Sequence, residues 1–317
     1  FFSQADQQLT IDFFACGLSE LNHDGDRCMI LMPGNRPGGM SHLIQQALLQ
    51  IGAVPVPCGN DVSFAHMARL LAVHRVNTMV GSPVQILSLA RYLQHYQLPH
   101  SIKAVLVSSD YLPESVRLAI ADTLQCAVYD HYGITEGGLG FSIECEQHQG
   151  LHIRENDLLV EIINPETGQP VSDGQWGELV FTTLTRRAMP LIRYRTGDKA
   201  RLLATPCACG SVVKRMDKIG GRLTQLAEPY TITELDERIF QLPSVVDYQV
   251  HYQKAQHQLT LYVLLTEPLS QWKDAIETLL QPVLQQGDTL LVEGEMLPEQ
   301  QTEIGSFYQA KRKIMVE

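Results

Sequence analysis

The sequence predicts an α/β protein with a large N-terminal domain that combines a parallel sheet with an antiparallel or barrel-like β subdomain, followed by a small C-terminal α+β cap domain. Strand-like and helix-period segments alternate over residues 1–130, and strand-like segments separated by turns fill residues 141–221. Residues 222–317 mix helices and strands. The 317 residues are about twice a ~150-residue domain, which agrees with domains at 1–221 and 222–317.

The alternating segments of the N-terminal region have the spacing of parallel strands joined by crossover helices. The strands expected here cover residues 53–57, 78–80, 103–107 and 127–129. Helices are expected at residues 42–50, before the first of these strands, and at 64–71, 83–93 and 114–124, between successive strands. Ser82 and Pro83 predict the start of the third helix, because serine caps helices well and proline suits the first helical position.

From residue 141 onward the pattern changes to short strands and turns. Strands are expected at 141–145, 151–153, 158–163 and 178–183, with turn clusters at 164–168 and 172–174. The last unit is expected to hold a helix at 231–241, strands at 245–252 and 258–265, and a helix from about 271 that Pro282 bends or ends. Gly220 and Gly221 are the expected hinge between the domains, because glycine tolerates large backbone rotations.

Composition excludes several classes of protein. Lys and Arg number 24 against 35 Asp and Glu, a formal charge of −11, which argues against binding nucleic acid. Polar residues interrupt every apolar run before membrane-spanning length, and seven cysteines, an odd number, fit a disulfide framework poorly. We therefore expect a soluble, cytoplasmic protein. No basic-then-apolar leader is seen at the start, which agrees with this expectation. The sequence begins without a methionine and directly in an apparently structured region, so we expect an upstream segment to be missing.

A polar loop follows the strand expected at 127–129. Residues 130–138 read Asp-His-Tyr-Gly-Ile-Thr-Glu-Gly-Gly, which offers an aromatic ring, a hydroxyl and a carboxylate where ligands of open α/β sheets bind. These groups suit stacking on a base, bonding a phosphate and holding Mg²⁺ through oxygen. A glycine-rich turn with incidental polar residues is the competing interpretation.

Asp198 closes a second motif, Arg-Tyr-Arg-Thr-Gly-Asp at 193–198. A carboxylate after a glycine turn can accept hydrogen bonds from both hydroxyls of a ribose. The competing interpretation is a turn aspartate that bonds its own backbone.

The two motifs, Tyr-Gly-Ile-Thr-Glu at 132–136 and residues 193–198, closely resemble the acyl-adenylate-forming superfamily of acyl-CoA synthetases, peptide-synthetase adenylation domains and luciferases. Segments 150–153, 165–168 and 177–185 resemble its phenylacetate–CoA ligase branch more narrowly. The resemblance covers most of residues 1–222 and is faint beyond.

This resemblance implies that ATP activates an aryl or similar carboxylic acid as acyl-AMP, and that a thiol, by default CoA, then takes the acyl group. It implies that Tyr132 stacks on adenine, that Thr135 bonds the α-phosphate and that Glu136 holds Mg²⁺. The other nucleotide-binding residues that it implies are Ser108, Ser109, Asp110, Asp130, His131, Gly133, Asp198 and, at the hinge, Arg222. The acid pocket is expected from segments 32–39 and 137–141.

Three departures from the family pattern qualify this expectation. The phosphate loop that ends in Gly-Lys is missing, and residues 2–6 resemble the segment that comes directly after this loop in the family, which indicates truncation there. Residues 223–229 replace the usual two aspartates and Arg-Gly, which puts CoA transfer in doubt and favours an acyl carrier protein or a reductase as acceptor. Lys311 is the nearest match for the family's catalytic lysine and is preferred over Lys313. Two alternatives remain: that the protein is a relic that binds nucleotide without catalysis, and that it forms a homodimer through exposed strand edges.

A zinc site is predicted beside these motifs. Cys207 and Cys209 form a Cys-x-Cys turn, and zinc requires two further nitrogen or sulfur ligands at tetrahedral angles. Cys145 and His152 are the candidates, with His148 in reserve, and some members of the resembling branch pair such a turn with a cysteine and a Gly-Leu-His segment. Buried thiols that bind no metal are the competing interpretation.

Overall fold

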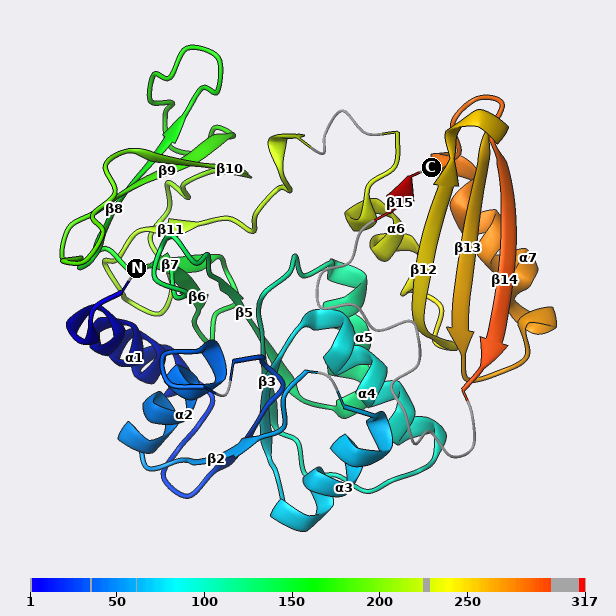
Figure 1. Ribbon diagram of the computed structural model, residues 1–317, viewed down its shortest axis with the longest axis horizontal. Helices are drawn as coiled ribbons and strands as arrows, with labels where there is room; N and C mark the ends of the chain where they lie inside the picture. The colour runs from blue at the N-terminus through cyan, green and yellow to red at the C-terminus, as the bar shows by residue number, and fades with distance from the viewer. Residues whose placement is uncertain (1, 35, 61, 225–228, 298–313, 317) are drawn as a thin grey trace.

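The structure, a computed structural model, describes residues 2–34, 36–60, 62–224, 229–297 and 314–316 (Figure 1). Its strands form an eight-stranded sheet of order β11-β7-β6-β5-β4-β3-β1-β2, a three-stranded sheet β10-β9-β8 and a four-stranded sheet β14-β13-β12-β15. The predicted α/β class, with a parallel sheet, antiparallel strands and a small C-terminal α+β unit, is confirmed. Within the described residues, no helix combines the length and apolar character needed to cross a bilayer.

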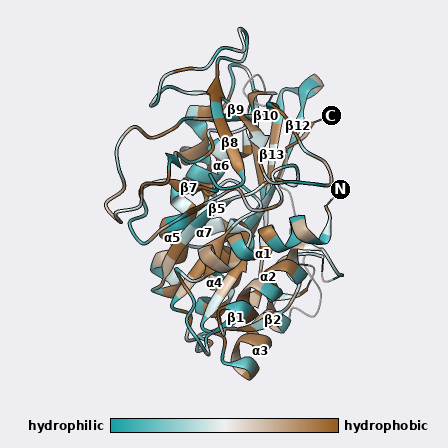
Figure 2. Ribbon diagram, turned by 90° about the vertical axis from the view of Figure 1, so that its left-hand side faces the viewer, coloured by the Kyte–Doolittle hydropathy of each residue, from teal (hydrophilic) through white to brown (hydrophobic). Residues whose placement is uncertain are grey.

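Five parallel strands make up the first part of the large sheet. They are β1 (Arg27–Ile30), β2 (Val54–Pro57), β3 (Thr78–Gly81), β4 (Ala104–Val107) and β5 (Ala127–Tyr132). The helices of this region are α1 (Gln4–Leu18), α2 (Met40–Gln50), α3 (Phe64–His74), α4 (Pro83–His95) and α5 (Glu114–Leu124). Figure 2 shows both hydrophobic and hydrophilic colour on these helices, as expected where one face is buried.

The two faces of the parallel sheet pack against different helices. Cys28 and Ile30 join a core with α1 and α2, whereas Met29 and Leu31 join a core with α3, α4 and α5. This division follows from the alternation of side chains along a strand. In β5 the same alternation directs successive side chains to opposite faces of the sheet. Neighbouring residues at the end of β5 therefore lie in different surroundings.

The antiparallel strands divide between two sheets. Strands β6 (Ser142–Glu144), β7 (Leu151–Ile153) and β11 (Arg215–Met216) continue the large sheet beyond β5. Strands β8 (Leu158–Ile163), β9 (Gly177–Thr183) and β10 (Tyr194–Ala200) form the separate sheet. The sequence predicted one β subdomain here, and part of that region instead extends the eight-stranded sheet with antiparallel strands.

The C-terminal unit places two helices on a mixed sheet. It consists of α6 (Ile232–Ile239), β12 (Val245–Gln253), the 3-10 turn η2 (Lys254–Gln256), β13 (Gln258–Leu265), α7 (Leu269–Leu280), the 3-10 turn η3 (Gln281–Val283), β14 (Thr289–Met296) and β15 (Met315–Val316). As expected, Pro282 ends α7. This unit adds to the core on the α3–α5 face, where Ser88 and Arg91 of α4 donate hydrogen bonds to the carbonyls of Val246 and Phe240 (2.7 and 2.8 Å).

Candidate active site

The end of β5 presents His131 and Tyr132 to opposite faces of the sheet and then turns sharply. A Cβ at Gly133 would lie 1.8 Å from the carbonyl oxygen of Leu139, so no other residue fits this position without moving the backbone. The turn that follows carries Thr135 and Glu136. Gly133 therefore has a local structural role in bringing the loop back under the strand.

Tyr132, Asp198 and Arg222 converge from three segments of the chain. The Tyr132 hydroxyl donates to Asp198 Oδ2 at 2.6 Å, and Arg222 Nε lies 3.2 Å from Asp198 Oδ1. Burial and the Asp198 charge raise the pKa of Tyr132 well above its usual value, so its hydroxyl remains a donor. We call these three residues the Tyr132 cluster.

The backbone explains how Asp198 and Arg222 meet. The register of β10 against β9 shifts between Arg195 and Lys199, and Gly197 within this bulge has a φ of 73°. Asp198 then forms an isolated antiparallel bridge with Arg222, the residue that follows Gly220 and Gly221. The expected ribose ligand, which is only 4% exposed, is thus fixed between the small sheet and the domain connection.

Thr135 and Glu136 lie in the turn beyond β5. Thr135 is exposed and Glu136 is half-buried. The pKa of Tyr194 is raised by burial and by Glu136, whose carboxylate accepts a hydrogen bond from it. A carboxylate oxygen is a hard donor of the type that Mg²⁺ prefers, so the chemistry of Glu136 fits the expected cation. Lys311, the expected catalytic lysine, lies outside the described residues.

Asp130 is buried beneath this site. Its backbone N–H donates to Glu144 Oε2 at 2.9 Å, and Glu144 is itself paired with Arg117 at 2.8 Å. Burial, together with the Glu144 charge, raises the pKa of Asp130 to about 7. Asp130 is therefore a group whose protonation changes near neutral pH.

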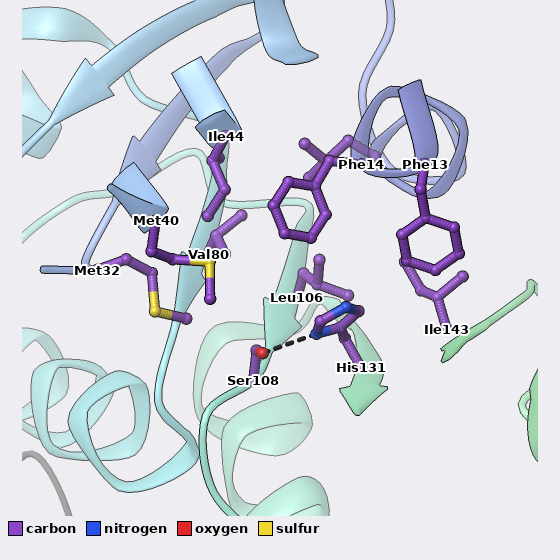
Figure 3. A pocket seen from close by; sticks show the side chains of 11 residues that line it. Phe13, Phe14, Met32, Met40, Ile44, Val80, Leu106, Ser108, His131 and Ile143 are labelled. Atoms are coloured by element: carbon purple, nitrogen blue, oxygen red, sulfur yellow. Dashed lines mark hydrogen bonds between the residues drawn. The ribbon is translucent and has the colours of Figure 1, made fainter. Parts of the chain in front are cut away.

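Ser108 and His131, both expected on the nucleotide side, instead line an apolar pocket on the other face of the sheet (Figure 3). Ser108 Oγ and His131 Nδ1 are 2.7 Å apart. Ser109 has a left-handed φ of 77°, and it is exposed, as is Asp110. The Asp110 carboxylate accepts a hydrogen bond from the backbone N–H of Tyr111.

The pocket draws on a helix that the sequence patterns did not predict. Phe13 and Phe14 of α1 close one side, and among the described residues of the expected segments 32–39 and 137–141, Met32 lines it. The rest of the lining is Leu18, Met40, Ile44, Val80, Leu106 and Ile143. Ser3 and Asp6 form a capping box at the start of α1, a sequence signal that would have located this helix.

The predicted zinc ligands come together. One ligand atom from each of Cys145, His152, Cys207 and Cys209 lies within 4.8 Å of the others. Cys145 Sγ and Cys207 Sγ are 3.7 Å apart, and Cys209 Sγ lies 3.5 Å from His152 Nε2. Tetrahedral zinc with its usual bond lengths would set these separations at about 3.8 and about 3.6 Å. These two separations match those expected for zinc, and we call the four residues the Cys/His cluster.

His148, the reserve ligand, lies apart from this cluster. Its Nδ1 is 3.3 Å from Glu144 Oε2, and its ring packs on Tyr129 with centroids 4.9 Å apart. His152 lies near Cys207 and Cys209 because β7 pairs with β11, and β11 closely follows the segment that carries the two cysteines.

Comparison with known proteins extends these observations. A family model for AMP-binding enzymes matches residues 40–184. The phenylacetate-coenzyme A ligase of Thermus thermophilus is 36% identical over 159 residues, which are 48% of this chain and 35% of that protein. The Escherichia coli phenylacetate-coenzyme A ligase is 33% identical over 180 residues, 55% of this chain and 40% of that protein. The chain thus spans less than half the length of these relatives.

A solved structure agrees on the fold. The crystal structure of 2-hydroxyisobutyryl-CoA ligase in the postadenylation state, in complex with R3-HIB-AMP, superimposes with a TM-score of 0.81 at 20% identity. The superposition covers 100% of this chain and 71% of that one. Over the matched segment, the chain is thus similar to AMP-binding enzymes and, among the relatives, to phenylacetate-coenzyme A ligases.

Proposed function

We propose that the protein activates a carboxylic acid, aryl or similar, with ATP to give acyl-AMP and pyrophosphate. The observation that carries this proposal is the Tyr132 cluster, in which an aromatic ring and a buried carboxylate converge beside the Thr135–Glu136 turn. An apolar pocket lies across β5 from this cluster. Similarity to AMP-binding enzymes over residues 40–184 supports the same reaction.

Each residue at this site has a role in the proposed reaction. A carboxylate oxygen of the acid attacks the α-phosphorus, and the bond from that phosphorus to pyrophosphate breaks. Negative charge on the phosphoryl oxygens increases during this step, so preplaced donors lower its barrier. Thr135 supplies a hydroxyl to these oxygens, and Mg²⁺, held by Glu136, would neutralise part of their charge. Lys311 is proposed to act on the same oxygens.

The nucleotide itself is proposed to bind through the remaining residues. Asp198 accepts hydrogen bonds from the ribose hydroxyls, with Arg222 fixing its carboxylate. The Tyr132 ring stacks on adenine, and Asp130 reaches the adenine amino group. The acyl portion of the acid lies in the apolar pocket, because that lining suits a hydrocarbon body. The acyl group then passes to CoA, a step that the names of the relatives support.

Replacement of Asp198 tests this proposal. In the full-length protein, Asp198→Asn is expected to weaken the binding of a non-hydrolysable acyl-AMP analogue about 100-fold, because a neutral amide cannot accept two hydroxyl donors while pairing with Arg222. Calorimetry measures the affinity, and ATP–pyrophosphate exchange measures turnover. Asp173→Asn, at an exposed turn, is the matched control. Unchanged affinity in Asp198→Asn, or no exchange with any acid despite ATP binding, would contradict adenylation.

We also propose that the Cys/His cluster binds a structural zinc ion. The support is the match of its two closest ligand separations to tetrahedral zinc. The ion would join the Cys207–Cys209 turn to β7 and the end of β6, and it would take no part in the reaction. Metal analysis of the purified protein is expected to give about one zinc per chain.

A further inference from the structure

The apolar pocket contains one polar pair, and that pair has an unused atom. The pocket has about 360 Å³ of empty space, part of it open to solvent, and its lining is aliphatic, aromatic and methionine side chains, with Ser108 and His131 as the polar exceptions. His131 is 5% exposed, and its Nε2 has no hydrogen-bond partner among the described residues. In Figure 3 the imidazole lies between Ser108 on one side and Phe13, Phe14 and Leu106 on the other.

Counting hydrogen bonds assigns the tautomer of His131. Burial lowers the pKa of His131 to about 4, so the ring is neutral near pH 7 and carries one N–H. If Nδ1 carried it, the Ser108 O–H and the Nε2 lone pair would both be left unpaired. If the Ser108 hydroxyl donates to Nδ1, the Nε2–H alone remains. The second arrangement leaves fewer buried polar groups unsatisfied and makes Nε2 a donor.

We propose that His131 Nε2–H binds an oxygen acceptor, such as a ring hydroxyl, on the body of the acid, so that the preferred substrates are oxygen-substituted acids. This inference rests on the proposed function, because it takes the pocket to hold the acyl group. Ser108 is a positioning residue here, since it acts by fixing which ring nitrogen donates. An amino substituent on an aromatic ring is a poorer partner, because its lone pair is delocalised into the ring.

The apolar surroundings of His131 make this hydrogen bond a basis for discriminating between acids with and without an oxygen substituent. The Phe14 ring meets the imidazole edge-on, with centroids 5.8 Å apart, and Phe13 lies 6.2 Å away. A purely hydrocarbon acid would fill the pocket, exclude water and leave the N–H buried without a partner. Sites built to bond a substrate oxygen reject analogues that lack it much more strongly than apolar pockets reject an extra methyl group.

Matched acyl-AMP analogues test the inference in the full-length protein. The probes are acyl-sulfamoyl adenosines of benzoate and phenylacetate, each unsubstituted, with one ring hydroxyl, or with one methyl group at the same position. The wild-type protein is expected to bind at least one hydroxylated analogue about tenfold or more tightly than its methyl counterpart. In His131→Phe, which has a ring but no donor, this preference is expected to disappear.

Two further variants keep the test decisive if His131→Phe does not fold. His131→Gln retains an N–H donor and is expected to restore part of the preference. Ser108→Ala removes the partner that fixes the tautomer, and is expected to reduce the hydroxyl-to-methyl ratio severalfold. Equal affinity of the wild-type protein for hydroxyl and methyl analogues would overturn the inference and leave the proposed function standing. Failure of every analogue and of AMP to bind would overturn both.

Discussion

The Tyr132 cluster and the Cys/His cluster both involve strands of the antiparallel region, yet they satisfy their polar atoms in different ways. In the Tyr132 cluster the partners complement one another, because a hydroxyl and a guanidinium each donate to a different oxygen of Asp198. In the Cys/His cluster three sulfur atoms and an imidazole nitrogen face one another. The first cluster pairs strong donors with a carboxylate, whereas the second has only weak thiol contacts, Cys145 with Cys207 and Cys209 with His152, and its sulfur and nitrogen atoms suit a soft cation.

Because of this difference, we expect one cluster to affect mainly nucleotide binding and the other to affect mainly the stability of the fold. A self-satisfied cluster keeps its geometry without a ligand, so its residues are expected to affect nucleotide affinity more than stability. A set of metal ligands contributes to stability through the metal, because the unfolded chain does not hold the four groups together. Substitutions in the two clusters should therefore change different measured quantities.

The largest expected effect is loss of the metal. Cys207→Ser, or removal of metal by a strong chelator, is expected to lower the Tm by roughly 10 °C, since occupancy at about 1,000 times Kd contributes about 4 kcal/mol. Differential scanning calorimetry with metal analysis measures both changes. Cys126→Ser, a half-buried cysteine outside the cluster, is the control. If Cys207→Ser melts like the wild type and neither protein contains zinc, the cluster consists only of packed side chains.

A smaller effect, on binding alone, is expected at Tyr132. Tyr132→Phe keeps the ring but removes the hydroxyl that holds Asp198, so AMP affinity should fall about tenfold, because a hydrogen bond to a charged group is worth about 1.5–3 kcal/mol. The Tm should change by only a few degrees. Calorimetric titration with AMP measures the affinity, and Tyr262→Phe in the C-terminal sheet is the control. AMP binding that is unchanged or tighter would show that this hydroxyl does not position Asp198.

Much of the fold follows from local patterns in the sequence. The helix at 83–95 carries a serine–proline start, and the strand at 104–107 is an apolar run bounded by polar residues, so both were predicted to within a few residues. Helix α1 was missed because its apolar residues do not form a clean stripe. Strand β14 was missed because most of it is exposed at the edge of its sheet.

The site shows a similar division. Tyr132 and Asp198 were predicted from motifs, and the structure brings their side chains into contact across 66 residues. The placement of His131 depends on strand alternation and on α1, two features that a motif does not encode. Arg193 and Arg195 belong to the second motif, yet they pair with Glu161 and Glu178 and hold the small sheet together. Motif membership therefore predicted which residues lie near one another, but it does not give the role of each residue.

The smallest expected effect is on the pH dependence of stability and involves Asp130, which connects the Tyr132 cluster with the Cys/His cluster. This residue lies two positions before Tyr132, and its N–H bonds Glu144, the neighbour of Cys145. Its pKa is about 7 in the folded state, against an ordinary 3.8, because burial and Glu144 outweigh Arg117 and Lys218. The folded protein therefore keeps a proton that the unfolded chain releases, and this contribution to stability is lost as the pH rises from about 4 to about 7.

Asp130→Asn removes this titration with little change in shape. Between pH 6 and pH 8 the free energy of unfolding of the wild-type protein should fall by about 1.4 kcal/mol because Asp130 loses its proton. The variant lacks this contribution, so its Tm should fall by about 3–4 °C less over the same pH range. Thermal melts at pH 6, 7 and 8 measure it, with the exposed Asp122→Asn as control. An identical pH dependence in Asp130→Asn would mean that Arg117 and Lys218 already keep Asp130 ionised at pH 6.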